Sequence, residues 1–96
     1  MRLRLLSPAE TELAEAAKRY QDQVAGLGSD FLDEVLVALK KIREFPEAWA
    51  PVSKFQRRCR LNRFPYGLIY EIRTEEIVIA SVMHLHRHPD HWKKRL

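Results

Sequence analysis

Basic side chains are concentrated between residues 54 and 63, at a spacing that suits a β-strand. Alternate side chains of an extended segment point to opposite faces, so Arg58 and Arg60 share one face while Cys59 and Leu61 share the other. Arginine guanidinium groups bind phosphates or carboxylates through paired hydrogen bonds. The row indicates a docking surface for nucleic acid or an acidic peptide, or else an ordinary solvated strand face. Its basic residues are Lys54, Arg57, Arg58, Arg60 and Arg63.

Histidine is the second residue type able to do chemistry, and its four copies all lie near the C-terminus. His84, His86 and His88 share a parity on an extended segment and His91 follows, so their imidazoles are candidates to converge on a metal. Pro89 interrupts that geometry, and the segment offers no cysteine. We therefore expect no metal and no cofactor. His84 remains a candidate general acid or base for RNA cleavage, with nearby arginines stabilising the charge on phosphate.

Cysteine and the aromatic residues are better explained by packing than by chemistry. Cys59 is the single cysteine and falls on the apolar side of its strand, where we expect a buried thiol rather than a nucleophile. Trp92 is expected to plug the tail against the domain rather than to stack on a base. Tyr66 and Tyr70 are expected in the core or hairpin, and Trp49 at the end of a helical hairpin.

Two helices are predicted to precede the basic strand. Ser7 as the cap, Pro8 at the first helical position and Glu10 as the capping-box partner start a helix over residues 8–25. Asp30 is expected to cap a second helix that ends at Pro46. Gly26-Leu27-Gly28 is a short connection, so the helices should form an antiparallel hairpin. The apolar stripe of the second helix is Phe31, Leu32, Val35, Leu36, Leu39, Ile42 and Phe45.

Extended segments are predicted at residues 2–6, 53–63, 68–73 and 77–83, with a bend at Phe64-Pro65-Tyr66-Gly67. The order is β-α-α-β-β-β, an α+β domain in which the helical hairpin packs on a small antiparallel sheet. Val78, Ala80 and Val82 would then lie on the face away from the helices. Because these side chains are apolar, we expect a partner protein or a second copy to cover them, since the tail is too short for a whole sheet face.

Length and charge limit the classes of protein that remain. The chain has 96 residues, which is enough for one domain, and it has no signal peptide or apolar run of transmembrane length. With one cysteine, a reducing compartment and a cytoplasmic location are expected. Residues 1–50 carry a net charge of −2 and residues 51–96 one of +6, which together give the +4 of the chain. This asymmetry favours an anionic partner.

Three segments in order resemble the RelE/ParE family of toxins. They are Phe45-Pro46, the run RRCRLNRFPYGLIY at residues 57–70, and the tail His84-x-x-Arg87-x-Pro89-x-x-Trp92-x-x-Arg95. The similarity spans nearly the whole chain, so residues 1–96 are treated as one toxin-like domain.

The resemblance implies the toxin half of a type II toxin–antitoxin pair, neutralised by a ParD-like antitoxin whose extended segment wraps the domain. Such a segment would cover the apolar face, and its acidic residues would pair with arginines. The antitoxin-binding residues implied in this way are Arg58, Arg60, Val78, Ala80 and Val82.

Two activities occur in the family. RelE-like members cut messenger RNA in the ribosome, for which Lys54, Arg60 and His84 would be the catalytic residues here. ParE-like members inhibit DNA gyrase without catalysis. Because no tyrosine follows the last strand, we favour the ParE-like branch. The target-binding residues would be His84, Arg87, Trp92 and Arg95. A binding module that has lost its toxicity is the third interpretation.

Overall fold

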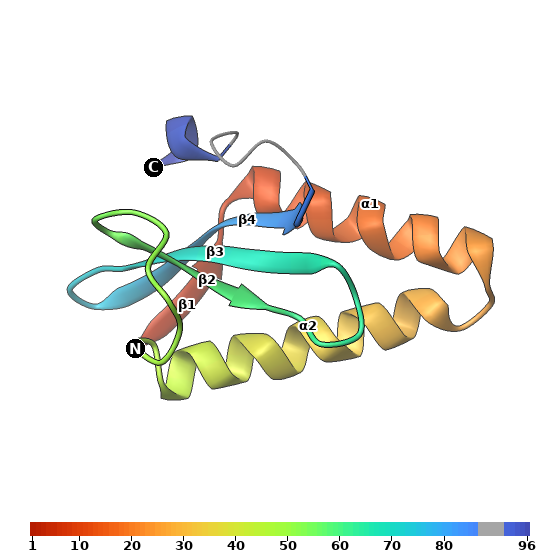
Figure 1. The fold of residues 1–96 in the computed structure, drawn as a ribbon, viewed down its shortest axis with the longest axis horizontal. Coiled ribbons are helices and arrows are strands. Elements are labelled where there is room, and N and C mark those ends of the chain that lie inside the picture. Colours follow the sequence, from red (N-terminus) through yellow and green to blue (C-terminus); the bar gives the residue numbers. More distant parts are fainter. Residues whose placement is uncertain (87–91) are drawn as a thin grey trace.

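A computed structural model describes residues 1–86 and 92–96 (Figure 1). The predicted β-α-α-β-β-β order is confirmed, and a short 3-10 turn, η1, follows it. The elements are β1 (Arg2–Leu5), α1 (Ser7–Gln23), α2 (Leu27–Glu44), β2 (Gln56–Arg60), β3 (Tyr66–Ile72), β4 (Glu76–His84) and η1 (Lys93–Arg95).

Helix α1 begins directly after β1, and its cap differs from the prediction. Leu6, with extended backbone angles, occupies the cap position, and Ser7 is already helical. No side chain of the described residues caps this end; the backbone N–H of Glu10 donates to the Leu6 carbonyl at 3.0 Å. The predicted Ser7 capping box is therefore wrong, because a single residue joins strand to helix and Ser7 is drawn into the first turn. Pro8 still lies in that turn, as predicted.

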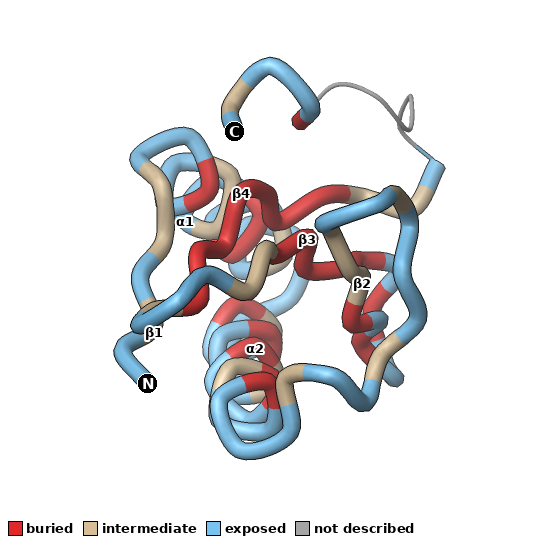
Figure 2. The backbone as a smooth tube through the Cα atoms, turned by 90° about the vertical axis from the view of Figure 1, so that its left-hand side faces the viewer, coloured by how far each residue is buried: buried red, intermediate tan, exposed pale blue. Residues whose placement is uncertain are grey.

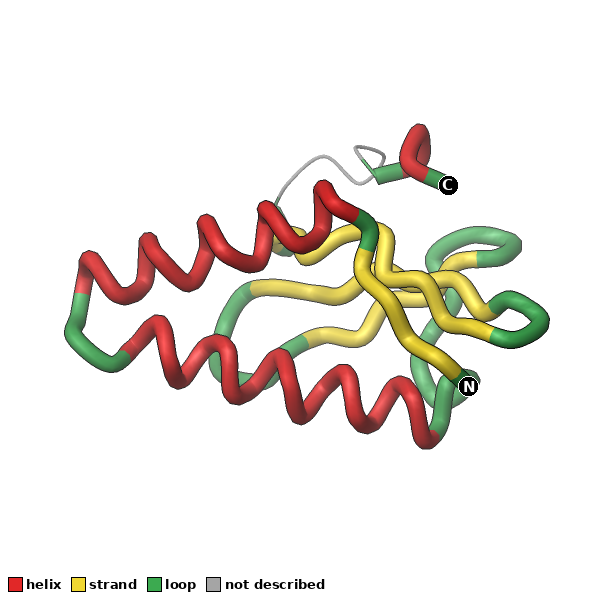
Figure 3. The backbone as a smooth tube through the Cα atoms, turned by 180° about the vertical axis from the view of Figure 1, so that it is seen from behind, coloured by secondary structure: helices red, strands yellow, loops and turns green. Residues whose placement is uncertain are grey.

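Helix α2 begins three residues before the predicted cap. Gly26 has a φ of +89°, a left-handed conformation that glycine adopts without steric cost, and it reverses the chain. The Gln21 side-chain oxygen accepts the N–H groups of Gly26 at 3.0 Å and Gly28 at 3.3 Å. The Gln21 oxygen thus accepts backbone N–H groups at the start of α2, which is the role predicted for the Asp30 side chain. Asp30 lies in the first turn of the helix instead. The antiparallel hairpin itself is confirmed (Figure 3).

The four strands form one sheet in the order β1-β4-β3-β2. The β2–β3 and β3–β4 pairs are antiparallel as predicted, whereas β1 runs parallel to β4, so the sheet is mixed. Strand β2 is shorter than expected, and the bend is shifted. Tyr66 and Gly67 are the first residues of β3, and the Leu61 N–H donates to the Tyr66 carbonyl at 2.9 Å to close the turn over residues 61–65.

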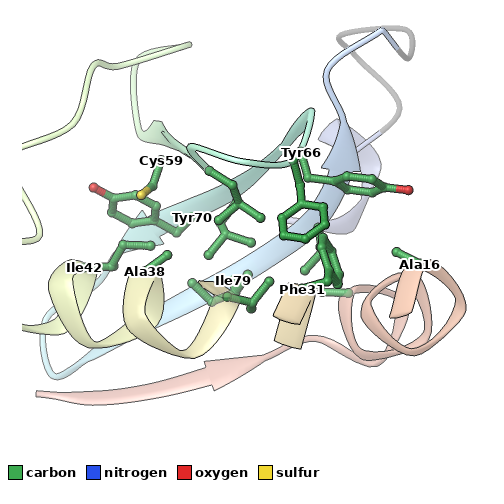
Figure 4. Packing of buried hydrophobic residues seen from close by; sticks show 14 of the residues in the cluster. Ala16, Phe31, Ala38, Ile42, Cys59, Tyr66, Tyr70 and Ile79 are labelled. Carbon is green, nitrogen blue, oxygen red and sulfur yellow. The ribbon is translucent and has the colours of Figure 1, made fainter. Parts of the chain in front are cut away.

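The main core lies between the sheet and the helical hairpin (Figure 4). Phe31 and Tyr66, whose ring centroids are 5.1 Å apart, belong to an aromatic group with Tyr20 and Phe64. The predicted helical stripe is broader than the buried one, because Leu36 and Phe45 are about three-fifths exposed. The residues of α2 that are buried are Gly28, Phe31, Val35, Ala38 and Ile42.

An irregularity in β4 changes which side chains face the helices. Ile69 pairs with Ser81 and Tyr70 pairs with Ile79, which leaves Ala80 as an extra residue. The alternation shifts there, so Val82 joins the helix-facing core with Ile79. The prediction that Val82 shares a face with Ala80 is therefore wrong.

The opposite face of the sheet, here called the outer face, is partly covered by the chain's own C-terminal segment (Figure 2). Trp92 is 3% exposed and packs with Ile69, Ala80 and Met83, against which Leu6 also lies. The predicted role of Trp92 as a plug is confirmed. Val78 is fully buried as well. The apolar outer face predicted to need a partner is thus already shielded from water at Val78 and Ala80.

Candidate interaction surfaces

The predicted alternation of β2 is confirmed. Cys59 and Leu61 are buried in the main core, whereas Arg60 is exposed and Arg58 half-buried on the outer face. A Cβ atom at Gly67 would lie 3.1 Å from Arg58 Cγ and 3.2 Å from Leu85 Cδ2. Because Gly67 has no side chain, the aliphatic part of Arg58 can lie over β3 at this position. The guanidinium groups of Arg58 and Arg60 form a basic patch on β2, which is an edge strand of the sheet.

The other basic residues of the segment make contacts within the chain. Arg57 Nη1 donates to the carbonyls of Glu47 at 3.1 Å and Trp49 at 2.7 Å, which fastens the loop after α2 to β2. Arg63 forms an ion pair with Asp30 at 3.6 Å. The Lys54 Nζ lies 5.3 Å from the ring centroid of Phe55. Of the five basic residues, Arg58 and Arg60 therefore form the basic patch, and the other three make contacts within the chain.

The structure does not bring together Lys54, Arg60 and His84, the residues predicted for phosphate cleavage. Arg60 pairs across the ladder with Gly67 and points to the outer face. His84 pairs with Tyr66, and their rings lie 5.2 Å apart on the helix-facing side. Lys54 precedes β2 in an exposed loop. Arg60 and His84 therefore lie on opposite faces of the sheet.

His84 belongs to a different group of polar side chains. Arg19 Nη2 donates to Tyr66 Oη at 2.6 Å, and His84 lies beside this pair in a small hollow that Glu12 and Glu15 also line. The backbone N–H of His86 donates to His84 Nδ1 at 3.2 Å. This bond requires an unprotonated Nδ1. The group thus contains the guanidinium of Arg19 from α1, the phenol of Tyr66 from β3 and the imidazole of His84 from the end of β4.

The C-terminal segment is fastened to β4 by Arg95. Its Nη1 donates to Glu12 Oε1 at 2.8 Å and to the Ala80 carbonyl at 3.0 Å, and its Nη2 donates to Glu12 Oε2 at 3.2 Å. Glu12 Oε1 also accepts the Ser81 hydroxyl at 3.0 Å and the Val82 N–H at 3.1 Å. Glu12 and Arg95 together occupy the edge of β4 beyond the point where β1 ends.

The predicted target-binding residues therefore differ in their surroundings. Trp92 and Arg95 anchor the C-terminal segment, and His84 lines the hollow beside α1. Arg87 lies outside the described residues. Sequence reasoning missed Glu12, because nothing in its local spacing links it to Ser81 or to Arg95, which are 69 and 83 residues away.

Burial determines the chemistry of Cys59 and Tyr70. Burial raises the pKa of the Cys59 thiol to about 11, so at neutral pH it is protonated and a poor nucleophile. Burial also raises the pKa of Tyr70 to about 12, and the Tyr70 hydroxyl donates to the Pro46 carbonyl. Both residues pack in the main core as predicted. Trp49 packs against the same core from the loop after α2.

Within residues 1–86 and 92–96, no three histidine, cysteine or acidic side chains are grouped so as to hold a metal ion. His88 and His91, part of the predicted histidine cluster, lie outside them. Neither helix has the length and hydrophobicity needed to span a bilayer.

Comparison with known proteins gives consistent matches. Residues 3–89 match the family model described as the ParE toxin of the type II toxin–antitoxin system parDE. The chain is 34% identical over 93 residues to Toxin ParE2 of Mycobacterium tuberculosis, in strains CDC 1551 and H37Rv, covering 93% of this chain and 86% of the relative. A solved structure titled a chromosomal ParDE TA system from P. aeruginosa superposes with a TM-score of 0.71 at 18% identity, covering 88% of this chain and 95% of that one.

Proposed function

Since this chain belongs to the ParE toxin family of type II toxin–antitoxin systems, we propose that it inhibits DNA gyrase, and hence replication, and is neutralised by a cognate ParD-like antitoxin. The observation that carries the gyrase assignment is the separation of Arg60 and His84 on opposite faces of the sheet. Phosphate cleavage needs its acid, base and charge-stabilising groups around one phosphate. Inhibition by binding needs only a surface.

The proposed target-binding surface is the C-terminal region around the end of β4. Lys93 and Lys94 are exposed there, and His84 is half-buried. In this proposal Trp92 and Arg95 act by holding the segment on the domain, and Arg87 remains a candidate contact. Gyrase acts on chromosomal DNA, so the proposal places the protein in the cytoplasm.

The proposed antitoxin contacts centre on the basic patch of Arg58 and Arg60. An acidic segment would pair with these guanidinium groups. Contact with Val78, Ala80 or Val82 is less favoured than the sequence suggested, because each is at most 1% exposed. An antitoxin would reach Ala80 only by displacing Trp92.

A supercoiling assay with purified gyrase tests the proposal directly. We expect the free chain to block supercoiling of relaxed plasmid and to leave broken plasmid, and we expect prior addition of the antitoxin to restore supercoiling. A heat-unfolded sample is the control for non-specific inhibition by a basic protein. A soluble, folded chain that stops growth on induction without affecting gyrase would overturn the assignment. No effect on growth would favour a binding module that has lost its toxicity.

A messenger-RNA endoribonuclease is the second candidate, and the group around His84 is what favours it. The imidazole of His84 and the phenol of Tyr66 can both exchange protons, and Arg19 lies within hydrogen-bond distance of that phenol. In that case His84→Ala should lose ribosome-dependent cleavage, mapped by primer extension, while His86→Ala retains it. Equal cleavage by wild type and His84→Ala would exclude His84 as the catalyst.

A further inference from the structure

The face of α2 that points away from the core carries apolar residues where a surface helix is normally polar. The α2 side chains that face the core are those of Phe31, Val35, Ala38 and Ile42. Since 3.6 residues make one turn, the line opposite them passes between Leu36 and Val37. These two side chains are 59% and 50% exposed, and Leu32, one turn before Leu36, is 38% exposed. We call these three neighbouring residues the α2 strip.

Unpaired charges of opposite sign lie at the two ends of the α2 strip. Asp33 precedes Leu36 and Val37 by about one turn, Lys40 follows them by about one turn, and both are exposed. They are about 10 Å apart along the helix axis, which is too far for an ion pair within the helix. Within residues 1–86 and 92–96, neither forms an ion pair with any other residue. Both charges are therefore available to another molecule.

The helix dipole explains part of this arrangement and leaves the rest unexplained. Acidic residues are favoured near the start of a helix and basic residues near its end, which suits the positions of Asp33 and Lys40. The dipole gives no reason for two exposed apolar residues between them. An apolar centre flanked by one charge of each sign is instead the pattern of an interface that matches itself.

A second α2 helix placed antiparallel to the first makes that match. With the two-fold axis between Leu36 and Val37, Leu36 lies against Val37 of the second copy. Asp33 lies against Lys40 of the second copy, and symmetry repeats both contacts. A parallel arrangement would place each charge against its own copy, which is repulsive. The sequence of α2 therefore favours the antiparallel pairing.

The α2 strip is separate from the surfaces proposed for the target and the antitoxin. Figure 2 shows α2 on one side of the sheet and the C-terminal segment on the other. The basic patch of Arg58 and Arg60 also lies on the outer face, away from α2. Contact between two α2 helices thus leaves those surfaces open in both copies.

We propose that the α2 strip is a self-association surface through which two copies of this chain form an antiparallel, two-fold symmetric dimer. An acidic segment of another protein fits it less well, because such a segment would meet the carboxylate of Asp33 as well as the ammonium group of Lys40. One pair of helices lies at the small end of protein interfaces, under about 1,200 Å², so the dimer dissociates on dilution. The inference is independent of the gyrase assignment.

Charge reversal at either end of the strip tests the pairing by sedimentation equilibrium of the full chain. Asp33→Lys and Lys40→Asp each place like charges opposite one another, and we expect each to weaken dimerisation by roughly tenfold or more. The control is Glu75→Lys in the exposed turn between β3 and β4, which makes the same change in net charge as Asp33→Lys. It should stay within about threefold of the wild type. Circular dichroism verifies that each variant is folded.

Mixing the two reversed variants provides a second and stricter test. In a mixed dimer of Asp33→Lys with Lys40→Asp, the two substituted positions face each other with opposite charges, and so do the two native side chains. We therefore expect the mixture to recover dimerisation that neither variant shows alone. Native mass spectrometry distinguishes the mixed dimer from either homodimer by its mass.

Each contrary outcome removes a defined part of the inference. A wild-type chain that stays monomeric at every soluble concentration would overturn the dimer. Wild-type dimers that both reversals leave as strong as in Glu75→Lys would overturn the α2 strip as the surface. Weakening by each reversal without recovery in the mixture would overturn the antiparallel pairing. A monomeric wild type whose antitoxin binding is lost in both reversals, and kept in Glu75→Lys, would assign the strip to the antitoxin instead.

Discussion

At the scale of single residues, Glu12 of α1 is the side chain that binds polar groups along the edge of β4. Its carboxylate accepts hydrogen bonds from Ser81, the Val82 backbone and Arg95. Its side chain is 14% exposed and that of Arg95 is 20% exposed, so water replaces these bonds only in part.

Replacing Glu12 tests this arrangement. We expect Glu12→Ala to lower the free energy of unfolding by about 1–3 kcal/mol, because the Arg95 guanidinium and the Val82 N–H each lose a hydrogen-bond acceptor. Urea denaturation measures the change. The control is Glu15→Ala, an exposed position one turn away on the same helix, which should change stability by at most ~0.5 kcal/mol. Equal effects at the two positions would contradict the role of Glu12.

Cys59 leads to a prediction about alkaline pH. Burial raises the pKa of its thiol from the reference value of 9.0 to about 11, so the folded state disfavours the thiolate. The resulting contribution to stability is complete below pH 9 and is lost as the pH rises through 11. Tyr70, with its pKa raised to about 12, adds to the loss at higher pH.

We therefore expect the free energy of unfolding to fall between pH 9 and 11, and to fall less steeply in Cys59→Ala. Below pH 9 that variant should be less stable than the wild type because it leaves a cavity, so the slope against pH is the relevant measurement. Identical slopes in wild type and variant would show that the buried thiol does not titrate in this range.

At the scale of elements, the helical hairpin depends on a close contact at Gly28. A Cβ atom there would lie 2.6 Å from the Ala17 carbonyl oxygen and 2.9 Å from Gln21 Cβ. The contact involves the backbone of α1, so relief requires the two helices to move apart. Glycine is thus needed for packing, although alanine is the better helix former by about 1 kcal/mol.

We expect Gly28→Ala to destabilise the fold by about 1–3 kcal/mol despite that helix propensity. Thermal unfolding measures the change, and Ser29→Ala, an exposed neighbour in the same turn, is the matched control. A Gly28→Ala protein as stable as the control would mean that α1 and α2 are not closely packed at this point in solution.

Sequence periodicity predicted the elements better than it predicted their ends. The alternation of arginines with Cys59 and Leu61 gave the faces of β2 correctly, because polar and apolar residues differ there. In β4 every residue from Ile77 to Val82 except Ser81 is apolar. A shift at Ala80 leaves that pattern nearly unchanged, so the face of Val82 was predicted wrongly. The start of α2 was also misplaced, because its connection depends on the Gln21 side chain, which no local cap pattern includes.

The candidate site was predicted in part. The exposed Arg60 and the buried Trp92 follow from residue type and position. The contacts of Glu12 do not, because they join residues that are far apart in the chain and meet only after the sheet has formed. A row of five cations likewise gave no sign that Arg57 would bind the Glu47 and Trp49 carbonyls.

At the scale of the whole molecule, the outer face of the sheet depends on residues at the end of the chain. Figure 1 shows η1 beside the first turns of α1, and Trp92 supplies the apolar contact that keeps it there. The side chains beneath it, Ile69, Ala80 and Met83, are at most 3% exposed. Without this cover the protein would present an apolar patch of the kind that promotes association.

The last prediction follows from this cover. Trp92→Ala should reduce the free energy of unfolding by about 3–5 kcal/mol and bind the dye ANS, because it uncovers the patch, whereas Trp92→Phe should retain most of the stability. If Trp92 acts as an anchor, Trp92→Phe should also inhibit gyrase as the wild type does, since an aromatic ring still holds the exposed Lys94 in place. Loss of inhibition in a folded Trp92→Phe protein would instead indicate that the indole itself contacts the target. Unchanged stability in Trp92→Ala would show that the C-terminal segment does not cover the sheet in solution.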